Sequence, residues 1–429
     1  MSTFYSHSLE IISTLRKYEG LLVVKSVPRD NDPSALIAQL HILSSRLGND
    51  GGDGEEAKEC LRLSKALTAQ LEPPENTVID MAFSPIVAVS AQIAVDLNLF
   101  ENIVQNGPVT SARLAELSGA DEMLIIRILR LLSSVHFVAE TAPRTWKASR
   151  ITRTMATKEI AAGYRIISAT AVPAMQSAPS FLATPGRGYA FPTSPKDGLA
   201  QVTFNTERTM FEYVAANPAL LKDFNLYMGN NMGARRSWLE WFPVQREILD
   251  EVDLDLETEK KKVLIVDVGA GKGHDLVAFA KKFPDAGGRL VLQDLPAVTE
   301  GLDRELEVDG IEKVAYDFFT EQPIKGARVY FYHHIFHDWS DEYCLTILSR
   351  VLAAMTPGYS KLLIHDMILP EQGATQFQAQ MDISMMAFNG GMERTGKQWR
   401  ELLEGAGLRQ IRFWDPVDDG GDGIIEAVV

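Results

Sequence analysis

The chain has 429 residues, of which 46% are hydrophobic and 23% charged, and this composition excludes collagen-like and intrinsically disordered proteins. Forty-two basic and 57 acidic residues give a formal net charge of −15, which disfavours nucleic acid as a partner because the summed charge repels phosphates. Two cysteines far apart in the sequence exclude a disulfide framework, no apolar run indicates a membrane span, and the N-terminus lacks a secretory pattern, so we expect a cytoplasmic protein.

Residues 1–75 form an N-terminal extension in which apolar residues recur at three- and four-residue spacing. This period predicts helices over residues 9–22, 35–47 and 55–71. A stretch rich in glycine and aspartate at 49–54 predicts a linker, and Pro73-Pro74 is expected to close the segment. Nothing in the extension indicates catalysis, so we interpret it as a packing or solubilising arm.

Residues 76–156 predict a separate helical module. An apolar helix over 81–97 is followed by Thr110, which can cap the next helix, and then by a helix over 123–132 and a β-prone stretch at 135–139. Helices followed by a hairpin indicate a winged helix. DNA binding through the 123–132 helix is the alternative function, but that helix is apolar nearly all round. We therefore expect it to be buried and the module to build a homodimer.

Residues 157–245 form a mixed helical region rich in methionine and aromatic residues. Such side chains commonly fill a core, and they also line sites for flat apolar ligands. We expect the region to connect the domains on either side and to contribute substrate contacts, with Met228 and Met232 as candidates.

Residues 246–429 alternate strand and helix patterns, which is typical of a mostly parallel, doubly wound α/β sheet. The expected strands are residues 263–268, 289–295, 313–318, 327–335, 361–369, 410–414 and 423–429. Between the last two strands the turn at 418–423 leaves no room for a crossover helix. These two strands must therefore form an antiparallel hairpin.

The first strand runs directly into a glycine-rich turn formed by Gly269, Gly271 and Gly273, and then into a helix. Alternate glycines in a strand-to-helix turn let a ligand approach the backbone closely. Val266 and His274 stand where nucleoside-triphosphate and dinucleotide loops need glycine, which disfavours both ligand classes. The remaining GxGxG pattern resembles the S-adenosylmethionine (SAM) loop of Rossmann-like methyltransferases.

Acidic residues at strand ends extend this pattern. Asp294 ends the second strand 25 positions after the first glycine, where a carboxylate can accept hydrogen bonds from both ribose hydroxyls. Asp317 ends the third strand, where proteins of the resembling family contact adenine. Together with Asp267 in the first strand, and with Leu295 and Phe318, these residues are the expected SAM contacts.

Three histidines, His333, His334 and His337, follow one another closely at the end of the fourth strand. Metal ligands on one face of a strand need alternate positions, so only His333 and His337 can share a face. Two histidines without a third ligand make a poor metal site, and we predict no metal here.

The segment from His337 to Glu342 reads HDWSDE. It closely resembles the signature of plant and fungal small-molecule O-methyltransferases, and the resemblance extends over residues 76–429. It implies a Rossmann-like catalytic domain with a seven-stranded, mostly parallel sheet that ends in an antiparallel hairpin, preceded by a winged-helix dimerisation domain. It also implies SAM as the cofactor and a small molecule as the substrate.

The same resemblance implies roles for particular residues. His337 is the general base, and an imidazole of ordinary pKa near 6.5 can accept a phenolic proton at neutral pH. Asp366 stands where the family has a glutamate that orients this histidine, with an arm one carbon shorter. Glu393 matches the second family glutamate, and Met386 and Asn389 match positions that line the substrate.

One departure from the family pattern concerns His333, which stands where relatives have lysine or arginine near the SAM carboxylate. A neutral imidazole there would weaken the electrostatic contact.

The leading interpretation is a SAM-dependent O-methyltransferase that methylates an aromatic or enolic hydroxyl in secondary metabolism. The alternative is a cyclase of the same fold that catalyses dehydration or a pericyclic ring closure on a polyketide-derived pyridone, with SAM bound but not consumed. A SAM-sensing or structural protein without catalysis is the third.

Overall fold

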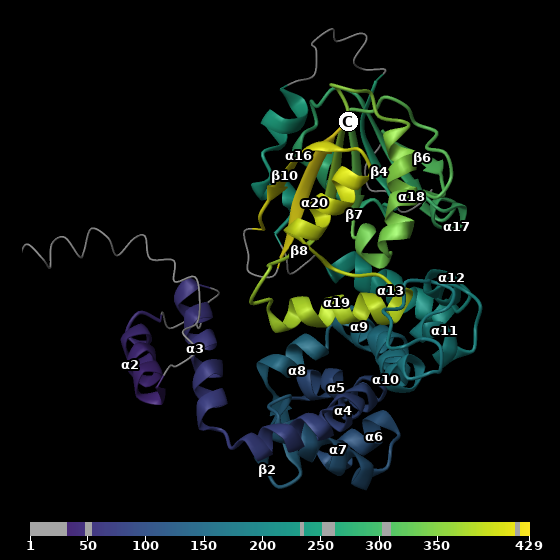
Figure 1. The fold of residues 1–429 in the computed structure, drawn as a ribbon. Coiled ribbons are helices and arrows are strands. Elements are labelled where there is room, and N and C mark those ends of the chain that lie inside the picture. The colour runs from purple at the N-terminus through teal and green to yellow at the C-terminus, as the bar shows by residue number, and fades with distance from the viewer. Residues whose placement is uncertain (1–31, 48–53, 232–235, 251–261, 303–309, 417–420) are drawn as a thin grey trace, which may run out of the picture. The chain divides into compact units, whose positions relative to one another are not determined.

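A computed structural model describes residues 32–47, 54–231, 236–250, 262–302, 310–416 and 421–429 (Figure 1). The helix expected at 9–22 lies outside the described residues. The chain divides into two units, Met1–Ile86 and Val87–Val429, and each is described by itself.

The first unit holds α2 (Pro33–Ser44), α3 (Glu55–Leu71) and the start of α4 (Pro74–Asp96). Helices α2 and α3 pack together, and each has one fully buried leucine, Leu36 and Leu63. Both helices were expected from the apolar spacing. Pro73-Pro74 separates α3 from α4, as expected, and α4 begins at Pro74 itself. Proline is well tolerated in the first turn of a helix.

Helix α4 leaves a row of large apolar side chains exposed in the single chain. Val78, Met81, Phe83 and Val89 are 69%, 70%, 59% and 56% exposed. Among the described residues, α4 is the one helix whose length and composition would suffice to cross a membrane, which corrects the expectation that no apolar run reaches that length. Length and composition are weak evidence of a span, and a helix covered by a partner chain has the same properties.

The second unit begins at Val87, within α4, and the module that follows has the elements expected of a winged helix. Its elements are α5 (Leu99–Asn106), β1 (Val109–Thr110), α6 (Ser111–Ser118), α7 (Glu122–Ser134), β2 (Val138–Ala142), β3 (Thr145–Ala148) and α8 (Arg150–Met155). Thr110 caps α6 by accepting a hydrogen bond from the Arg113 N–H at 3.3 Å, as the sequence predicted. The strands form a small antiparallel sheet in the order β1-β3-β2.

Helix α7 is buried mainly on one side, against the core of its own module. Its residues Ile125, Leu129 and Leu132 are fully buried in the module's own core, whereas Met123 and Leu124 are about half exposed. The expected burial of α7 is therefore confirmed on its core-facing side, but it is achieved within the single chain and does not require a partner. The longest exposed apolar row in this part of the chain lies on α4.

A group of helices connects this module to the sheet. They are α9 (Lys158–Ala169), α10 (Ala171–Leu182), α11 (Leu199–Phe204), α12 (Met210–Ala215), α13 (Pro218–Asn231), α14 (Trp238–Trp241) and the π-helix η1 (Gln245–Leu249). Helix α19 (Gln376–Asn389), which comes much later in the chain, packs against α10 and α11 (Figure 1). The connector and the sheet domain therefore share one core, to which α19 contributes Met386, Ala387 and Phe388.

The central sheet has the strand order β10-β11-β8-β7-β4-β5-β6, and a two-residue strand, β9, pairs with β8. The strands are β4 (Val263–Val268), β5 (Arg289–Asp294), β6 (Ile311–Ala315), β7 (Val329–His333), β8 (Lys361–Leu369), β9 (Arg394–Thr395), β10 (Arg409–Trp414) and β11 (Asp422–Val428). Strands β4 to β8 pair in parallel, and β11 runs antiparallel to both β8 and β10. The mostly parallel sheet with a terminal hairpin is confirmed.

Both faces of the sheet are covered by helices. Tyr330 and Tyr332 of β7 face a core that includes α18 (Asp341–Leu352) and α20 (Gly396–Gly405), whereas Val329 and Phe331 face a core that includes α14 and α16 (His274–Lys282). Strands buried on both faces read as continuous apolar runs, which explains the composition of β4 and β8. The strand order reverses at β4, and ligands of such sheets bind at the carboxyl ends of the strands beside that point.

Candidate active site

The turn after β4 has a backbone that glycine adopts easily. Gly269, Gly271 and Gly273 have φ angles of 73°, 54° and 73°, all in the left-handed region. The amides of Gly269 and Ala270 donate to the Gln293 carbonyl at 2.8 and 3.1 Å, which fixes the turn against β5. A Cβ at Gly269 would collide with Ile335, whereas a Cβ at Gly271 would meet no protein atom within 4 Å. Space beside the turn is therefore open at Gly271.

Two carboxylates lie beside this turn, Asp267 buried and Asp294 half-buried. Asp294 accepts hydrogen bonds from the Gly271 and Leu295 amides, each at 2.7 Å, and burial raises its pKa while these two bonds oppose the rise. Asp267 is 2% exposed, and burial together with the charges of Asp275 and Asp294 raises its pKa well above its ordinary value. The sequence therefore predicted correctly that acidic side chains gather at the glycine turn, and their contacts to SAM stay a prediction.

Asp317 and Phe318 follow β6 at the same edge. The Asp317 carboxylate is exposed and accepts a hydrogen bond from the Phe319 amide at 3.0 Å, so it stabilises its own turn. Phe318 packs edge-on against Phe319 and Trp339, with ring centroids 5.0 and 5.9 Å apart. Leu295 is 47% exposed. The adenine contacts expected of this segment stay predictions.

The candidate base His337 lies on the short 3-10 helix η3 (Phe336–Asp338) and is 6% exposed. Its Nδ1 lies 2.8 Å from Oε1 of Glu393, which is itself 2% exposed. An ionised carboxylate can only accept, so Nδ1 carries the proton and Nε2 is left as the basic nitrogen. Nε2 is therefore the ring atom that can accept a proton from a substrate.

The expectation that Asp366 orients His337 through a hydrogen bond is not met. Asp366 is fully buried on β8, and neither of its carboxylate oxygens has a hydrogen-bond partner among the described residues. Burial raises its pKa to about 7. Glu393 makes the orienting bond instead, and Asp366 acts on His337 through its charge alone.

The electrostatic surroundings of His337 differ from those of an isolated imidazole. Burial alone would lower its pKa, but the nearby carboxylates of Glu393, Asp338 and Asp366 raise it well above its ordinary value. Burial raises the pKa of Asp338 to about 6, and its Oδ1 lies 3.8 Å from His337 Nε2. His337 is therefore a stronger base than its residue type suggests. Its ring is neutral, and so able to accept a proton, only at a pH above this raised pKa.

Two residues that sequence reasoning did not single out hold the loop that carries His337. Gly391 comes so close to the backbone of His337 and Asp338 that a Cβ there would overlap both residues. Arg394 is fully buried and donates to the carbonyls of Phe336 and Trp339 at 3.1 and 2.8 Å. Gly391 and Arg394 lie on either side of Glu393 in the Gly-Met-Glu-Arg-Thr segment. This local sequence pattern could therefore have identified both residues.

His333 does not have the neutral surroundings that the sequence suggested. Its Nδ1 lies 2.7 Å from Oδ2 of Asp275 on α16. Burial acts to lower the pKa of His333, but Asp275 raises it above the ordinary value, and the pKa of Asp275 is about 2 despite its burial. Direct contact of His333 with SAM stays a prediction.

The four residues expected to line the substrate lie in different parts of the structure. Asn389 is 2% exposed and donates from Nδ2 to the Asp338 carbonyl at 3.1 Å, so it lies against the loop of the candidate base. Met386, on the same helix, packs in the connector core. Met228 is half-buried on α13, and Met232 lies outside the described residues. Roles in substrate binding stay predictions for all four.

These residues fit SAM as a ligand. The left-handed glycine turn leaves open space at Gly271, and the carboxylates at the ends of β4 and β5 lie beside it. Aromatic rings gather around Trp339, where Phe211 and Phe319 lie with centroids 6.1 and 4.8 Å away. A small-molecule cofactor with a ribose and a flat base needs surroundings of this kind.

Comparison with known proteins agrees with this geometry. Residues 205–409 match the O-methyltransferase domain, and residues 80–158 match the O-methyltransferase dimerisation domain. O-methyltransferase penC of Penicillium thymicola is 57% identical over 93% of this chain and 97% of its own length. The solved structure of LepI in complex with SAM, and one described as a pericyclic reaction enzyme, are each 30% identical with a TM-score of 0.79. They cover 92% of this chain and 98% and 99% of their own.

The chain therefore belongs to the O-methyltransferase family, and the resemblance inferred from the HDWSDE segment is confirmed. It has the methyltransferase fold with an N-terminal dimerisation domain, and its cofactor is SAM.

Proposed function

We propose that this SAM methyltransferase methylates a hydroxyl group of an aromatic or enolic small molecule in secondary metabolism. The observation that carries the proposal is the buried pair His337–Glu393, in which Nδ1 and Oε1 are 2.8 Å apart. Transfer to a hydroxyl oxygen needs a group that removes its proton, and an imidazole oriented by a carboxylate is suited to that task.

The reaction divides into binding, orientation and proton removal. When bound, SAM would supply a methyl group activated by its sulfonium, and S-adenosylhomocysteine would remain once the methyl had passed from sulfur to the hydroxyl oxygen. His337 Nε2 accepts the hydroxyl proton. The Glu393 carboxylate stabilises the imidazolium that results, because a buried opposite charge is poorly screened. Arg394 and Gly391 keep the loop of His337 in place.

Mass spectrometry tests the proposal. The protein is incubated with SAM whose methyl group is deuterated and with a panel of phenols and enols. The expected product gains one labelled methyl, and an equal amount of S-adenosylhomocysteine forms. His337→Ala should lower the turnover rate by roughly 10²- to 10⁴-fold with little change in SAM affinity, because base catalysis acts in the transition state. Methyl transfer that survives this substitution within a few-fold contradicts the role of His337.

The alternative is a non-methylating cyclase, and the similarity to a pericyclic reaction enzyme supports keeping it in the test. In that reaction His337, in its protonated form, would donate a hydrogen bond to a substrate carbonyl. A substrate of the panel that rearranges while SAM stays unconsumed favours this alternative. The greater identity to penC, 57% against 30%, supports methyl transfer.

We also propose that the enzyme is a cytoplasmic homodimer joined through α4. The dimerisation domain and the exposed apolar row of α4 support this assembly. Light scattering should give twice the 47.5 kDa of one chain. Val78→Asp with Met81→Asp should dissociate the dimer, whereas Leu61→Asp, at an exposed apolar residue of α3, should not. A monomer at micromolar concentration contradicts the proposed homodimer. Microscopy of a fluorescent fusion protein tests the cytoplasmic location.

A further inference from the structure

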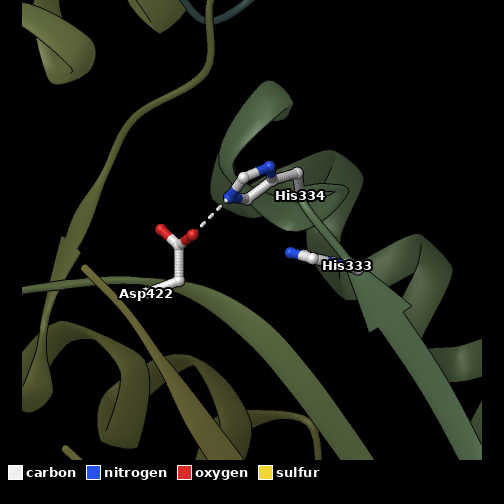
Figure 2. A group of neighbouring side chains, drawn as sticks. All are labelled: His333, His334 and Asp422. Atoms are coloured by element: carbon white, nitrogen blue, oxygen red, sulfur yellow. Dashed lines mark ion pairs between the residues drawn. The ribbon is translucent and has the colours of Figure 1, made fainter. Parts of the chain in front are cut away.

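A cluster of three side chains lies at the end of β7, beside the start of β11. Figure 2 shows His333, His334 and Asp422, with the two imidazoles and the carboxylate turned toward the same space. One ligand atom from each residue lies within 4.8 Å of the other two. His334 Nε2 is 3.0 Å from Asp422 Oδ2. The grouping joins two neighbouring residues at the end of one strand to a residue far along the chain.

His333 is oriented as a metal-binding histidine usually is. Its Nδ1 pairs with the Asp275 carboxylate at 2.7 Å, and Asp275 is held in turn by the Trp238 indole N–H at 2.8 Å. Its Nε2 is buried and has no hydrogen-bond partner among the described residues. A carboxylate on one ring nitrogen fixes the tautomer and leaves the other nitrogen as a directed lone pair.

The backbone explains how adjacent histidines can reach one ligand. Successive side chains of an extended strand point to opposite faces, so His333 and His334 could not share a ligand in a regular strand. His334 has a φ of 52°, in the left-handed region that residues with a side chain seldom adopt. Its amide donates to the His365 carbonyl at 3.1 Å, which holds this conformation. Strained backbone of this kind is concentrated at functional sites.

We propose that His333, His334 and Asp422 bind a divalent transition-metal ion, with Zn²⁺ as the probe. Two imidazoles and one carboxylate suit zinc and its neighbours, whereas Mg²⁺ and Ca²⁺ prefer oxygen ligands. Nitrogen and oxygen ligands of a tetrahedral zinc ion lie about 3.4 Å apart, given bonds of about 2.0 to 2.2 Å. The 3.0 Å separation of His334 Nε2 and Asp422 Oδ2 needs to open by only a few tenths of an ångström.

The metal would link the end of β7 to β11. His334 stacks on His337, with ring centroids 5.0 Å apart and ring planes 20° from parallel, so the linkage also reaches the segment of the candidate base. The proposal does not depend on methyl transfer, because its ligands and its test concern metal binding alone.

Metal titration of the full chain, with any affinity tag removed, tests the site. Calorimetry with Zn²⁺, and elemental analysis after gel filtration, should give one zinc ion per chain, and Mg²⁺ should not compete. His334→Gln and Asp422→Asn should each abolish the stoichiometric site. His274→Gln, which removes an exposed imidazole outside the cluster, is the matched control and should bind as the wild type does. Cobalt in the same site should show the visible absorption of a low-coordinate centre.

A second variant separates ligation from folding. Asp275→Asn keeps the size of the side chain but weakens the bond that orients His333, and it should lower zinc affinity about 10- to 100-fold. Circular dichroism of each variant checks that the fold is retained. The proposal is overturned if the wild type binds no zinc at micromolar concentration, or if the folded Asp422→Asn and His334→Gln proteins bind it as tightly as the wild type.

Discussion

Glu393 Oε1 lies 2.8 Å from His337 Nδ1, although 56 residues of chain separate the two. The bond is built by packing between segments. Helix α19 ends at Asn389, the chain turns at Gly390, and the Met392 amide donates to the His337 carbonyl at 2.9 Å. This contact places Glu393 beside the imidazole. The Glu393 amide in turn donates to the Asp382 carboxylate at 2.9 Å, which secures the segment from the other side.

The first prediction concerns the pH dependence of catalysis. The raised pKa of His337 means that kcat/KM should rise with pH through a midpoint above 6.5, because only the neutral ring can accept a proton. Glu393→Gln removes the largest influence that raises this pKa, so the midpoint should move down by roughly 1 to 3 pH units. The maximal rate should also fall, because a neutral amide stabilises the developing imidazolium less than a carboxylate does.

A matched variant is Glu342→Gln, which removes an exposed carboxylate from the same HDWSDE segment. Its pH profile should coincide with that of the wild type. Equal midpoints in the Glu393→Gln and wild-type profiles would falsify the assignment of Glu393 as the partner of the base.

Gly391→Ala tests how closely the two loops of the site must approach. The added methyl would overlap the backbone of His337 and Asp338, so one loop must move. We expect a loss of about 1–3 kcal/mol in the free energy of unfolding. A displacement of the base by about 1 Å should lower kcat on the order of 10²-fold. Gly396→Ala is the control, since a Cβ there meets no atom within 4 Å, and both variants can be compared by chemical denaturation and steady-state kinetics.

Asp366→Asn should change stability in a way that depends on pH. The carboxyl has a folded pKa of about 7 against about 3.9 for an unfolded aspartate, so the folded state holds the proton more tightly between these values. The protonated Asp366 carboxyl contributes to the free energy of unfolding of the wild type. This contribution is fully present below about pH 4 and is lost as the pH rises to about 7. The uncharged asparagine lacks this loss.

The stability of Asp366→Asn relative to the wild type should therefore increase between about pH 4 and pH 7, by up to roughly 4 kcal/mol over the whole titration, and stay constant above that range. Urea denaturation at several pH values measures it, and Asp285→Asn, at an exposed position, should give a flat difference. A flat difference for Asp366→Asn as well would show that the buried carboxyl does not titrate as described.

Gly271→Val tests the SAM site. The φ of 54° strains any residue with a side chain, and the new methyl groups would enter the open space beside the turn. Gly358→Val is the matched control, because Gly358 has a φ of 74° with no atom near its Cβ position but precedes the amino end of β8, away from the carboxyl edge. Both variants should lose stability, and only Gly271→Val should lose SAM affinity in calorimetry. Unchanged affinity in Gly271→Val contradicts the assignment of the glycine turn.

Local pattern was sufficient for the elements whose residues interact with near neighbours. The bounds of β4 and β8 agree with the expected strands residue for residue, and the cap at Thr110 forms as predicted. Each of these features is formed by consecutive residues: the apolar runs of the strands, the glycine turn and the short link before β11. For the same reason the hairpin and the parallel sheet could be inferred from the amino-acid sequence alone.

Contacts between distant segments were decided only by the tertiary structure. Asp366 and Glu393 both stand where the family has a carboxylate, yet only Glu393 forms a hydrogen bond to His337, because the bond depends on how the loop after α19 packs against η3. The register of β11 on β8 sets Asp422 opposite Met367, and this brings its carboxylate to within 3.0 Å of His334. From the sequence only His333 and His337 were considered as a pair, so the proposed ligand set could not be read from it. Such pairings follow from strand register and close packing across the chain, which no spacing within a single segment encodes.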